Sequence, residues 1–474
     1  MTVRQAAKST LPIFQKLTLC KESDVGARQF HEQERFYFKP QLWRCQDTDE
    51  LTPAGVNLFP MVTESNGSLW RPAFLYIADR VFSQRRLEMA THNNVVEDLV
   101  NFKRFLDSKN IRYDNFDLEI HELPTYRYRN FLQKQFNCGS IPSSTGNRRL
   151  QSVVSFYRFL FEKKLIIAKT SPWTDKEFQL NLTNEKGFRT VKKIQTTDMR
   201  LRAKSQPDPW SGTIYDGGKL RPLEWAEQKA LVSTLLKVGS PEMILVYLIA
   251  IFTGARIQTI LTLQNSSFRP ELVASSREIR IKVGPGTGVD TKGGKLLILI
   301  FPPWLYERIT IYCQSERSQH RRMKLARDDE SSCNVFLTKF GRPYYSTRKE
   351  RAAFDEKCTT RYESNGQEVR KFKSVLVEAI RCNEKLPHLS FRFHDLRATF
   401  GMNLTDAQMA LVETGVITLS EAREYVKFAM GHSSYETTDR YLSYRSNATF
   451  TRRVRDAYGD HLSTLSSLAK GSEL

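Results

Sequence analysis

Several features that would place this chain in a membrane or outside the cell are missing from its 474 residues. A membrane-spanning helix takes about 20 apolar residues, and the longest apolar stretch, Met243–Phe252, is too short to cross a bilayer. Residues 1–30 contain lysines and arginines throughout and no continuous apolar segment, so we expect no signal peptide. With 40% apolar residues, the chain can still bury sizeable cores, and its length suffices for two or three domains.

Cysteine is scarce and scattered. The chain has seven, an odd number, namely Cys20, Cys45, Cys138, Cys313, Cys333, Cys358 and Cys382. None of them forms a Cys-x-x-Cys pair, and none stands at metal-ligand spacing from a histidine. We therefore expect neither a disulfide framework nor a zinc site, and a reducing, cytoplasmic location. The sequence also lacks a carboxylate cluster at the spacing of a metal-dependent nuclease.

Acidic residues are outnumbered. The chain has 72 lysines and arginines against 52 acidic residues, a formal net charge of +20. A basic enzyme of any kind can reach this excess, but it more often serves a polyanion, whose binding is then sensitive to salt. The basic residues are spread through segments with a folded pattern, such as residues 147–164. This distribution predicts a folded DNA-binding surface rather than a disordered basic arm, with double-stranded DNA as the partner.

Residue patterns in the first part of the chain predict an N-terminal module and a helical domain. Residues 1–72 mix aromatic and basic residues around an Asn66-Gly67 turn, and predict either a packing module or an accessory DNA-binding module. Residues 73–170 predict a compact helical domain. Two apolar stripes at helical spacing support it, Val95, Leu99, Phe102 and Leu106 in one, and Leu150, Val153, Val154, Tyr157 and Phe161 in the other.

The rest of the chain divides at a composition change. Residues 171–219 concentrate proline, glycine and serine between basic segments, which predicts an interdomain linker that is partly ordered because it is long for a loop. A second domain follows over 220–450. The elements expected first in it are helices over 223–238 and 241–252, then strands over 277–284 and 296–302, joined by a glycine-rich turn.

Five side chains of this second domain suit the cleavage of a phosphodiester without a metal. They are Arg256 in TGAR, His394 and Arg397 in HDLR, and His432 and Tyr441, which are nine residues apart. Such a reaction needs groups that neutralise the phosphate charge, attack the phosphorus and protonate the leaving alkoxide. Arginine is always charged and bridges two oxygens, and a tyrosine hydroxyl can attack. A single arginine is more often part of a surface ion pair, so the prediction rests on the set.

The order of these residues resembles the tyrosine recombinase (phage integrase) family, whose motifs are an arginine, a hairpin lysine, His-x-x-Arg, Gly-His and a tyrosine. Here they read TGARIQTILTL, DTKGGK, FHDLRATF and MGHSSYETTDRYL. Residues 73–170 are similar to the family's helical core-binding domain. The resemblance implies a mainly α fold with a small β-sheet (α+β). A SAM-like core-binding domain and a catalytic domain over 220–450 would form a C-shaped clamp on DNA.

The resemblance also implies a role for each residue. Tyr441 is the nucleophile and forms a 3′-phosphotyrosyl bond. Arg256 and Arg397 clamp the non-bridging oxygens. His394 exchanges a proton with the nucleophile and hydrogen-bonds the phosphate, and His432 supports the transition state from the other side. The phosphotyrosine conserves the energy of the broken bond, so the family needs no ATP, no metal and no cofactor.

The lysine that protonates the leaving 5′-oxygen is a choice among three. In the family it lies in the turn of a β-hairpin, where this chain has Lys292 and Lys295. We prefer Lys292, which begins the Thr-Lys-Gly-Gly turn as the family lysine usually does. Lys282, along the first strand, is the third choice.

Two other tyrosines flank the nucleophile. Tyr435 lies three residues after His432, in an expected turn, and Tyr444 lies one helical turn after Tyr441. The TTDRY context favours Tyr441 over both. The remaining histidines match no motif, and we interpret them as surface or packing residues: His31, His92, His121, His320, His388 and His461.

The chain departs from the family pattern in two places. The family usually has an acidic residue three positions after the first arginine, and here that position holds Thr259. Ala255 stands where a larger residue is commoner. The first departure leaves open what braces Arg256. In addition, the stretch between His394 and Gly431 is longer than usual and predicts an extra turn or loop.

The resemblance implies a site-specific DNA recombinase that integrates, excises or transposes a mobile genetic element. It further implies a nucleoid-associated protein, a dimer on each site, a tetramer in synapsis and an accessory DNA-bending or directionality factor. In the family a tail such as residues 451–474 docks on a neighbouring protomer. The alternatives are a chromosome or plasmid dimer resolution recombinase, a non-catalytic DNA-binding protein on the same fold, and a topoisomerase.

Overall fold

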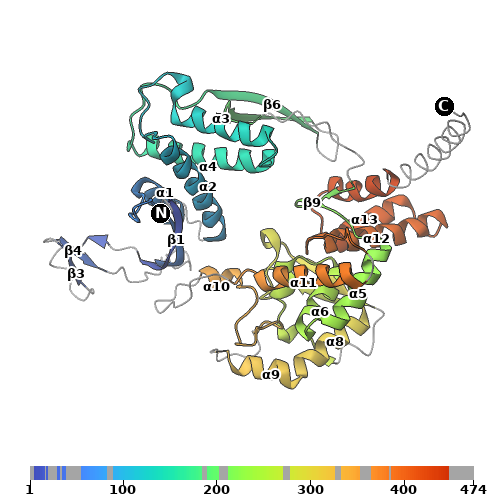
Figure 1. Ribbon diagram of the computed structural model, residues 1–474. Helices are drawn as coiled ribbons and strands as arrows, with labels where there is room; N and C mark the ends of the chain where they lie inside the picture. Colours follow the sequence, from blue (N-terminus) through green and yellow to red (C-terminus); the bar gives the residue numbers. More distant parts are fainter. Residues whose placement is uncertain are drawn as a thin grey trace, which may run out of the picture. The chain divides into compact units, whose positions relative to one another are not determined.

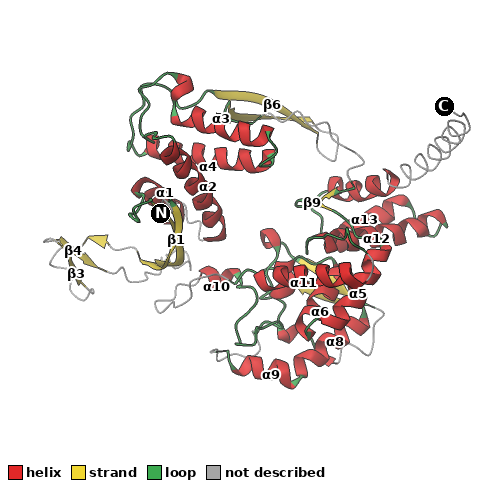
Figure 2. Ribbon diagram, in the orientation of Figure 1, coloured by secondary structure: helices red, strands yellow, loops and turns green. Residues whose placement is uncertain are grey.

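The computed structural model describes residues 5–15, 18–19, 29–32, 35–38, 55–82, 89–183, 189–201, 212–270, 278–325, 333–352, 364–383 and 386–447. The chain divides into two compact units. The first comprises Met1–Ser205 and Arg348–Tyr362, and the second comprises Gln206–Thr347 and Glu363–Leu474. Helices dominate the described residues and the sheets are small (Figures 1 and 2). The prediction of a mainly α chain with small β-sheets is confirmed.

The first unit contains short sheets and a group of helices. Its helices are α1 (Arg71–Phe82), α2 (Met89–Ser108), η1 (Ile120–Glu122), α3 (Pro124–Asn137), α4 (Ser143–Glu162) and α10 (Arg348–Ala352). Its strands are β1 (Ala7–Gln15), β2 (Thr18–Leu19), β3 (Gln29–Glu32), β4 (Arg35–Phe38), β5 (Gly55–Thr63), β6 (Asp175–Thr183) and β7 (Arg189–Thr197). They pair as β1-β5, β2-β4-β3 and β6-β7, and every pair is antiparallel.

Strands β1 and β5 share a hydrophobic core with helices α1 to α4. Phe59 of β5 is fully buried, and its ring centroid lies 4.5 Å from that of Phe14 in β1 and 5.4 Å from that of Phe74 in α1. Because aromatic rings bury large areas, these contacts join the strands firmly to the helices. Within the described residues, the predicted module 1–72 thus contributes strands to the core of the helical domain.

The two apolar stripes predicted in the helical domain face this core. Leu99, Phe102 and Leu106 of α2 are buried, as are Leu150, Val153, Val154 and Tyr157 of α4, while Val95 and Phe161 are partly buried against them. Asp98 is buried between the same helices and accepts hydrogen bonds from Arg148 and Ser152 of α4. Since a buried charge is tolerated only when paired, this contact also fixes how α2 meets α4.

The segment predicted as a linker, residues 171–219, contains paired strands. Phe178, Leu180 and Leu182 alternate with polar residues, a period-two pattern typical of a strand. They lie in β6, which pairs with β7 from Asp175↔Thr197 to Thr183↔Arg189. The first unit therefore continues to Ser205, beyond the predicted boundary at residue 170. The end of the predicted linker, residues 212–219, belongs to the second unit.

The second unit is mostly helical. Its helices are α5 (Trp225–Val238), α6 (Pro241–Thr253), α7 (Ile257–Leu261), η2 (Asn265–Ser267), η4 (Lys292–Gly294), α8 (Pro303–Gln314), α9 (Glu316–Met323), α11 (Gln367–Asn383), α12 (Asp395–Glu413) and α13 (Leu419–Met430). A further helical segment covers 435–447. Its strands are β8 (Ile214–Tyr215) with β9 (Lys219–Leu220), and β10 (Ile279–Val283) with β11 (Leu297–Phe301).

Helix α6 lies at the centre of the second unit, as its apolar sequence predicts. Most of its residues are buried, and Tyr247 donates a hydrogen bond to the carbonyl of Val369 in α11. The helix begins at Ser240, whose hydroxyl caps the amide of Met243, and ends at Gly254 in the left-handed conformation. The two predicted strands form the β10–β11 hairpin, in which Ile279, Ile281 and Val283 are buried and alternate with exposed residues.

The stretch between His394 and Gly431 contains α12 and α13, which pack against each other with residues 414–418 between them. The C-terminal tail, residues 451–474, lies outside the described residues. In the described part of the chain, none of the helices has the length and apolar character to cross a membrane.

Gly254 offers a test of how tightly α6 is held. Its φ is 64°, and a β-carbon added there would lie 2.4 Å from the ring of Phe400 in α12. Gly415 has a similar φ of 72° but open space around it. We expect Gly415→Ala to lower the free energy of unfolding by about 1 kcal/mol through backbone strain alone. Gly254→Ala should lose about 1–3 kcal/mol more through overpacking.

Urea denaturation of the two variants and the parent chain measures this difference. Equal losses for both variants would show that the contact between Gly254 and Phe400 does not hold the end of α6.

Candidate active site

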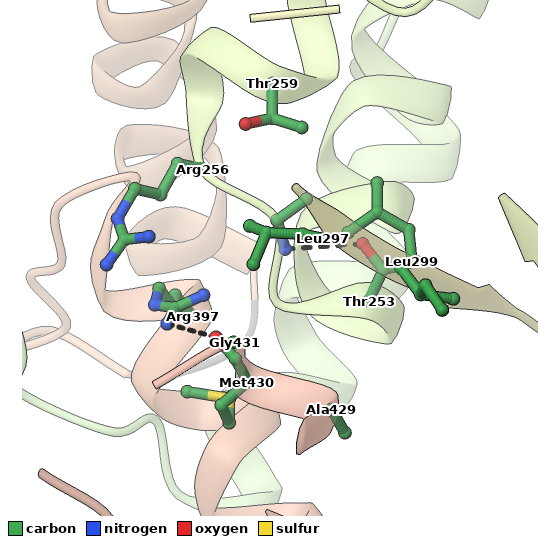
Figure 3. Close-up of a pocket in the computed structure, with 11 residues that line it drawn as sticks. Thr253, Arg256, Thr259, Leu297, Leu299, Arg397, Ala429, Met430 and Gly431 are labelled. Carbon is green, nitrogen blue, oxygen red and sulfur yellow. Dashed lines mark hydrogen bonds between the residues drawn. The ribbon is translucent and has the colours of Figure 1, made fainter. Parts of the chain in front are cut away.

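Arg256 is placed by the end of α6. Because Gly254 has a positive φ, the chain leaves the helix sharply, and Arg256 becomes the N-cap residue of the short helix α7. In Figure 3 its guanidinium lies next to that of Arg397. Both arginines line a small pocket with Thr253, Thr259, Leu297 and Leu299.

Arg397 lies in the first turn of α12, three residues after His394, which is the N-cap residue of that helix. Its side chain is only 4% exposed. Nη1 donates to the carbonyl of Gly254 at 2.9 Å and Nη2 to the carbonyl of Met430 at 2.7 Å. The buried guanidinium therefore links the ends of α6 and α13, and the Met430 contact is drawn in Figure 3.

His432 follows the end of α13 in the same manner as Arg256 follows α6. Gly431 ends α13 with a φ of 62°, and a β-carbon there would lie 2.7 Å from the side chain of Leu297. The His432 Nδ1 atom lies 3.0 Å from the hydroxyl of the buried Thr438. This contact fixes the plane of the imidazole ring and directs Nε2 to the opposite side.

Tyr441 lies in the helical segment 435–447 and is completely buried. Its ring stacks on the imidazole of His432, with centroids 5.6 Å apart. Gly401 of α12 makes room for it, because a β-carbon at that position would lie 2.4 Å from the tyrosine ring. Met402, Val426 and other apolar residues enclose the rest of the side chain. The candidate nucleophile is thus held in a fixed position beside a histidine.

The two flanking tyrosines have other partners. The hydroxyl of Tyr435 donates to Glu424 in α13, and the cationic groups of Arg423 and Lys427 lie over its ring. The hydroxyl of Tyr444 lies 3.5 Å from the carbonyl of Gly212. These contacts leave Tyr441 as the tyrosine whose hydroxyl lies among the arginines and His432.

The centre of the cluster is a residue that the sequence did not reveal. Asp216, in the turn between β8 and β9, is 4% exposed. Its Oδ2 accepts from Arg397 Nε at 2.7 Å and from the Tyr441 hydroxyl at 3.2 Å. The same oxygen lies 3.4 Å from His432 Nε2, and Oδ1 lies 3.4 Å from Arg256 Nη2.

Asp216 was missed because it stands in the segment read as a linker. The Asp-Gly-Gly sequence there signals a turn and carries no catalytic pattern. It is also separated from its partners by up to 225 residues, so no local spacing connects them. Asp216 does supply the acidic partner of Arg256 that position 259 lacks, although at the long distance of 3.4 Å. Thr259 itself is buried in the pocket beside Arg256.

The cluster shifts the pKa of each of its members. Burial alone would raise the pKa of Asp216, but the hydrogen bonds from His432 and Arg397 and the charge of Arg397 hold it far below its usual range. Burial raises the pKa of Tyr441 strongly, and the negative charge of Asp216 adds to the effect. Burial together with the neighbouring Arg397 lowers the pKa of Arg256 to about 10, so it stays charged at neutral pH.

Both histidines of the cluster are neutral at neutral pH. Burial and then the positive charges of Arg397 and Arg256 lower the pKa of His394 to about 4. Burial lowers the pKa of His432 as well, and Asp216 opposes that shift. A neutral imidazole can accept a proton or a hydrogen bond, which is the form that a proton-transfer role requires.

Lys292 is the lysine that the structure brings to this cluster. A β-carbon built on Gly217 would lie 3.1 Å from Lys292 Nζ and 4.0 Å from His394 Nε2. Both groups therefore border the turn that carries Asp216. Lys282 stands on the exposed face of β10. Lys292, the lysine preferred from the sequence, has its Nζ beside the turn of Asp216.

The remaining histidines lie away from the cluster where their side chains are described. His92 is buried in α2, and His121, His320 and His388 are exposed. The side chains of His31 and His461 lie outside the described residues. In the described ranges, no group of three or more histidine, cysteine or acidic side chains is arranged to hold a metal ion.

Comparison with known proteins gives similarities at the level of structure only. No family model matches the chain, and no curated protein sequence matches it. Among solved structures, the chain is similar to the XerH site-specific recombinase bound to its difH substrate, with a TM-score of 0.43 and 13% identity over 81% of this chain and 88% of that one.

Two further structures belong to the same kind of protein. One is the Tn1549 transposon integrase in complex with transposon right end DNA, with a TM-score of 0.42 and 16% identity over 80% of this chain and 98% of that one. The other is a lambda integrase dimer bound to a core site, with a TM-score of 0.38 and 10% identity over 78% and 93%. With TM-scores below 0.5, these likenesses do not by themselves establish what the chain does.

The lowered pKa of His394 predicts how stability depends on pH. Below about pH 6.5 the imidazole takes up a proton in the unfolded chain, while in the folded chain it stays neutral down to about pH 4. Above about pH 6.5 the imidazole is neutral in both states and does not change stability. Between about pH 6.5 and pH 4 the free energy of unfolding falls as the pH drops, by at most about 1.4 kcal/mol per pH unit. We expect His394→Asn to make this decline shallower.

The measurement is the free energy of unfolding from urea titrations between pH 4 and pH 8. A decline with the same slope in the variant and the parent chain would contradict the assignment of the buried, neutral state to His394.

Proposed function

We propose that this chain is a tyrosine recombinase that cleaves and rejoins DNA strands through a covalent 3′-phosphotyrosyl intermediate. The observation that supports this most directly is the convergence of Arg256, Arg397, His432 and the Tyr441 hydroxyl on one anion, the Asp216 carboxylate. A site that gathers these donors around a negative charge, next to a hydroxyl nucleophile, suits a phosphodiester.

Arg397 and Arg256 can donate hydrogen bonds to phosphate oxygens. Arg397 is anchored by the carbonyls of Gly254 and Met430, so its position does not depend on a ligand. The Nε of Arg256 is buried and has no hydrogen-bond acceptor among the described residues. Because an unsatisfied buried donor is unfavourable, an anionic oxygen placed there would be bound strongly.

In the proposed cleavage step, the Tyr441 oxygen attacks the phosphorus. A bond forms between this oxygen and phosphorus, and the bond from phosphorus to the 5′-oxygen of the next nucleotide breaks. His394, neutral in the free chain, accepts the tyrosine proton, and the ammonium group of Lys292 donates a proton to the leaving 5′-oxygen. Arg256, Arg397 and His432 stabilise the added charge on the phosphate oxygens.

Religation is the reverse of this step with a different strand. The 5′-hydroxyl of a partner strand attacks the phosphotyrosine and releases Tyr441, so no external energy source is consumed. The net charge of +20 supplies the attraction for double-stranded DNA. We propose integration, excision or transposition of a mobile element as the biological role, with a dimer on each site and a tetramer in synapsis.

Covalent capture tests the nucleophile. The chain is incubated without divalent metal with a library of nicked duplexes made from the DNA that flanks its gene, and adducts are resolved on a denaturing gel. We expect an adduct that Tyr441→Phe abolishes, since Tyr441 is the described tyrosine whose hydroxyl lies at the arginine cluster. Tyr435→Phe and Tyr444→Phe are matched controls and should retain the adduct, because their hydroxyls bond elsewhere.

Sequencing the captured DNA identifies the cleaved site. Absence of any adduct, or its persistence in Tyr441→Phe, would reject the proposed nucleophile.

Replacement of the hairpin lysines tests the general acid. On the captured site, Lys292→Ala should slow cleavage by about 10²–10⁴-fold, the usual contribution of such a proton transfer. Lys295→Ala, in the same turn, should change the rate little. A substrate with sulfur in place of the bridging 5′-oxygen should restore the rate of Lys292→Ala, because a thiolate leaves without protonation. Equal slowing of both variants, or no rescue by sulfur, would refute the assignment.

A further inference from the structure

The Asp216 carboxylate lies among the side chains that bind and attack the phosphodiester in the proposed function. One of its oxygens, Oδ2, is the acceptor for Arg397 Nε and the Tyr441 hydroxyl and lies 3.4 Å from His432 Nε2. In the proposed function these groups bind and attack the phosphodiester. While Tyr441 donates to Asp216, its hydroxyl is not directed at a phosphorus atom. The negative charge also repels an incoming phosphate, with little water to screen it.

If Asp216 served to hold the two arginines in place, different contacts would be expected. Arg397 is already held by the carbonyls of Gly254 and Met430, at 2.9 and 2.7 Å. Arg256 gains only a 3.4 Å contact from Asp216 and keeps a buried Nε without an acceptor. A brace also has no need to contact the nucleophile. The contacts of Asp216 are therefore those of an occupant of the anion site.

The segment that carries Asp216 is a short glycine turn, and Arg440 and Arg392 donate to the carbonyls of Tyr215 and Lys219 on either side of it. Strands β8 and β9 have two residues each, and Asp216 is followed by Gly217, with a φ of 68°, and Gly218. The Asp216 amide donates to the Gly218 carbonyl, so the turn is closed on itself. The buried Ile214 anchors its start among Met402, Met430 and Tyr441. Rotation within the glycine turn would withdraw the carboxylate while this anchor remains.

We propose that Asp216 is an autoinhibitory stand-in for the scissile phosphate, which DNA must displace from the arginine cluster before Tyr441 can attack. This proposal rests on the proposed function, because it takes the cluster to be a phosphate site. The turn also borders Lys292 and His394, since both lie near Gly217. One displacement of the turn would thereby free the anion site and change the surroundings of the two proton-transfer groups together.

Inorganic phosphate is the probe for the anion site, since its binding requires neither the DNA sequence nor strand cleavage. The full chain is titrated with phosphate at low ionic strength by calorimetry. Asp216→Asn keeps the shape of the side chain and removes its charge. If the carboxylate fills the site about 90% of the time or more, the variant should bind phosphate about tenfold or more tightly than the parent chain.

Two further variants define the result. Glu436→Gln removes one exposed charge from the same unit and should leave phosphate binding unchanged, which separates occupation of the site from net charge. Adding Arg256→Ala to Asp216→Asn should abolish the gain. Unchanged or weaker phosphate binding in Asp216→Asn would overturn the proposal, because that is the result expected of a brace.

Hydrogen exchange in the unaltered chain gives a second test that needs no variant to fold. Saturating phosphate should increase amide exchange in residues 214–220, as the turn leaves the cluster. Slower or unchanged exchange there would overturn the proposal. A gain in phosphate binding without any covalent DNA adduct would refute the proposed strand cleavage while leaving the occupation of the anion site by Asp216 intact.

Discussion

The buried guanidinium of Arg397 is the interaction on which the candidate site depends. A buried charge is tolerated only with several partners, and Arg397 finds them in the carbonyls of Gly254 and Met430 and the carboxylate of Asp216. These partners lie 143, 33 and 181 residues away in the chain. One side chain therefore brings together the end of α6, the end of α13 and the β8–β9 turn. Each of these segments carries another residue of the site.

The ends of α6 and α13 position Arg256 and His432 in the same way. Gly254 and Gly431 both have positive φ, and both are approached so closely by a neighbouring side chain that a β-carbon would collide with it. The chain turns sharply at each glycine, so Arg256 and His432 follow a rigid helix within three residues. Side chains placed in this way need little reorganisation when a ligand binds, which is what electrostatic stabilisation of a transition state requires.

The charges of the candidate site bear on the proposed role of Asp216. In the free chain the Asp216 carboxylate pairs with Arg397 and Arg256 and lies 3.4 Å from His432 Nε2. The pKa of Asp216 is held low and that of Tyr441 is raised, so the free chain keeps an anion at the centre and a protonated nucleophile beside it. Under the proposed function, this arrangement would become reactive when a phosphate replaces the carboxylate.

The sequence by itself determined the mainly α character, the helical stripes of α2 and α4 and the β10–β11 hairpin. It also predicted Arg256, His394, Arg397, His432 and Tyr441 as the candidate site residues. Each follows from local periodicity, from turn residues or from a short motif. Tertiary structure decided the rest. It placed β1 and β5 in the core of the helical domain, placed Lys292 Nζ beside the turn of Asp216, and brought Asp216 to the centre of the site. The physical reason is that these outcomes depend on burial and charge pairing between segments far apart in the chain, which leave no pattern in the local sequence.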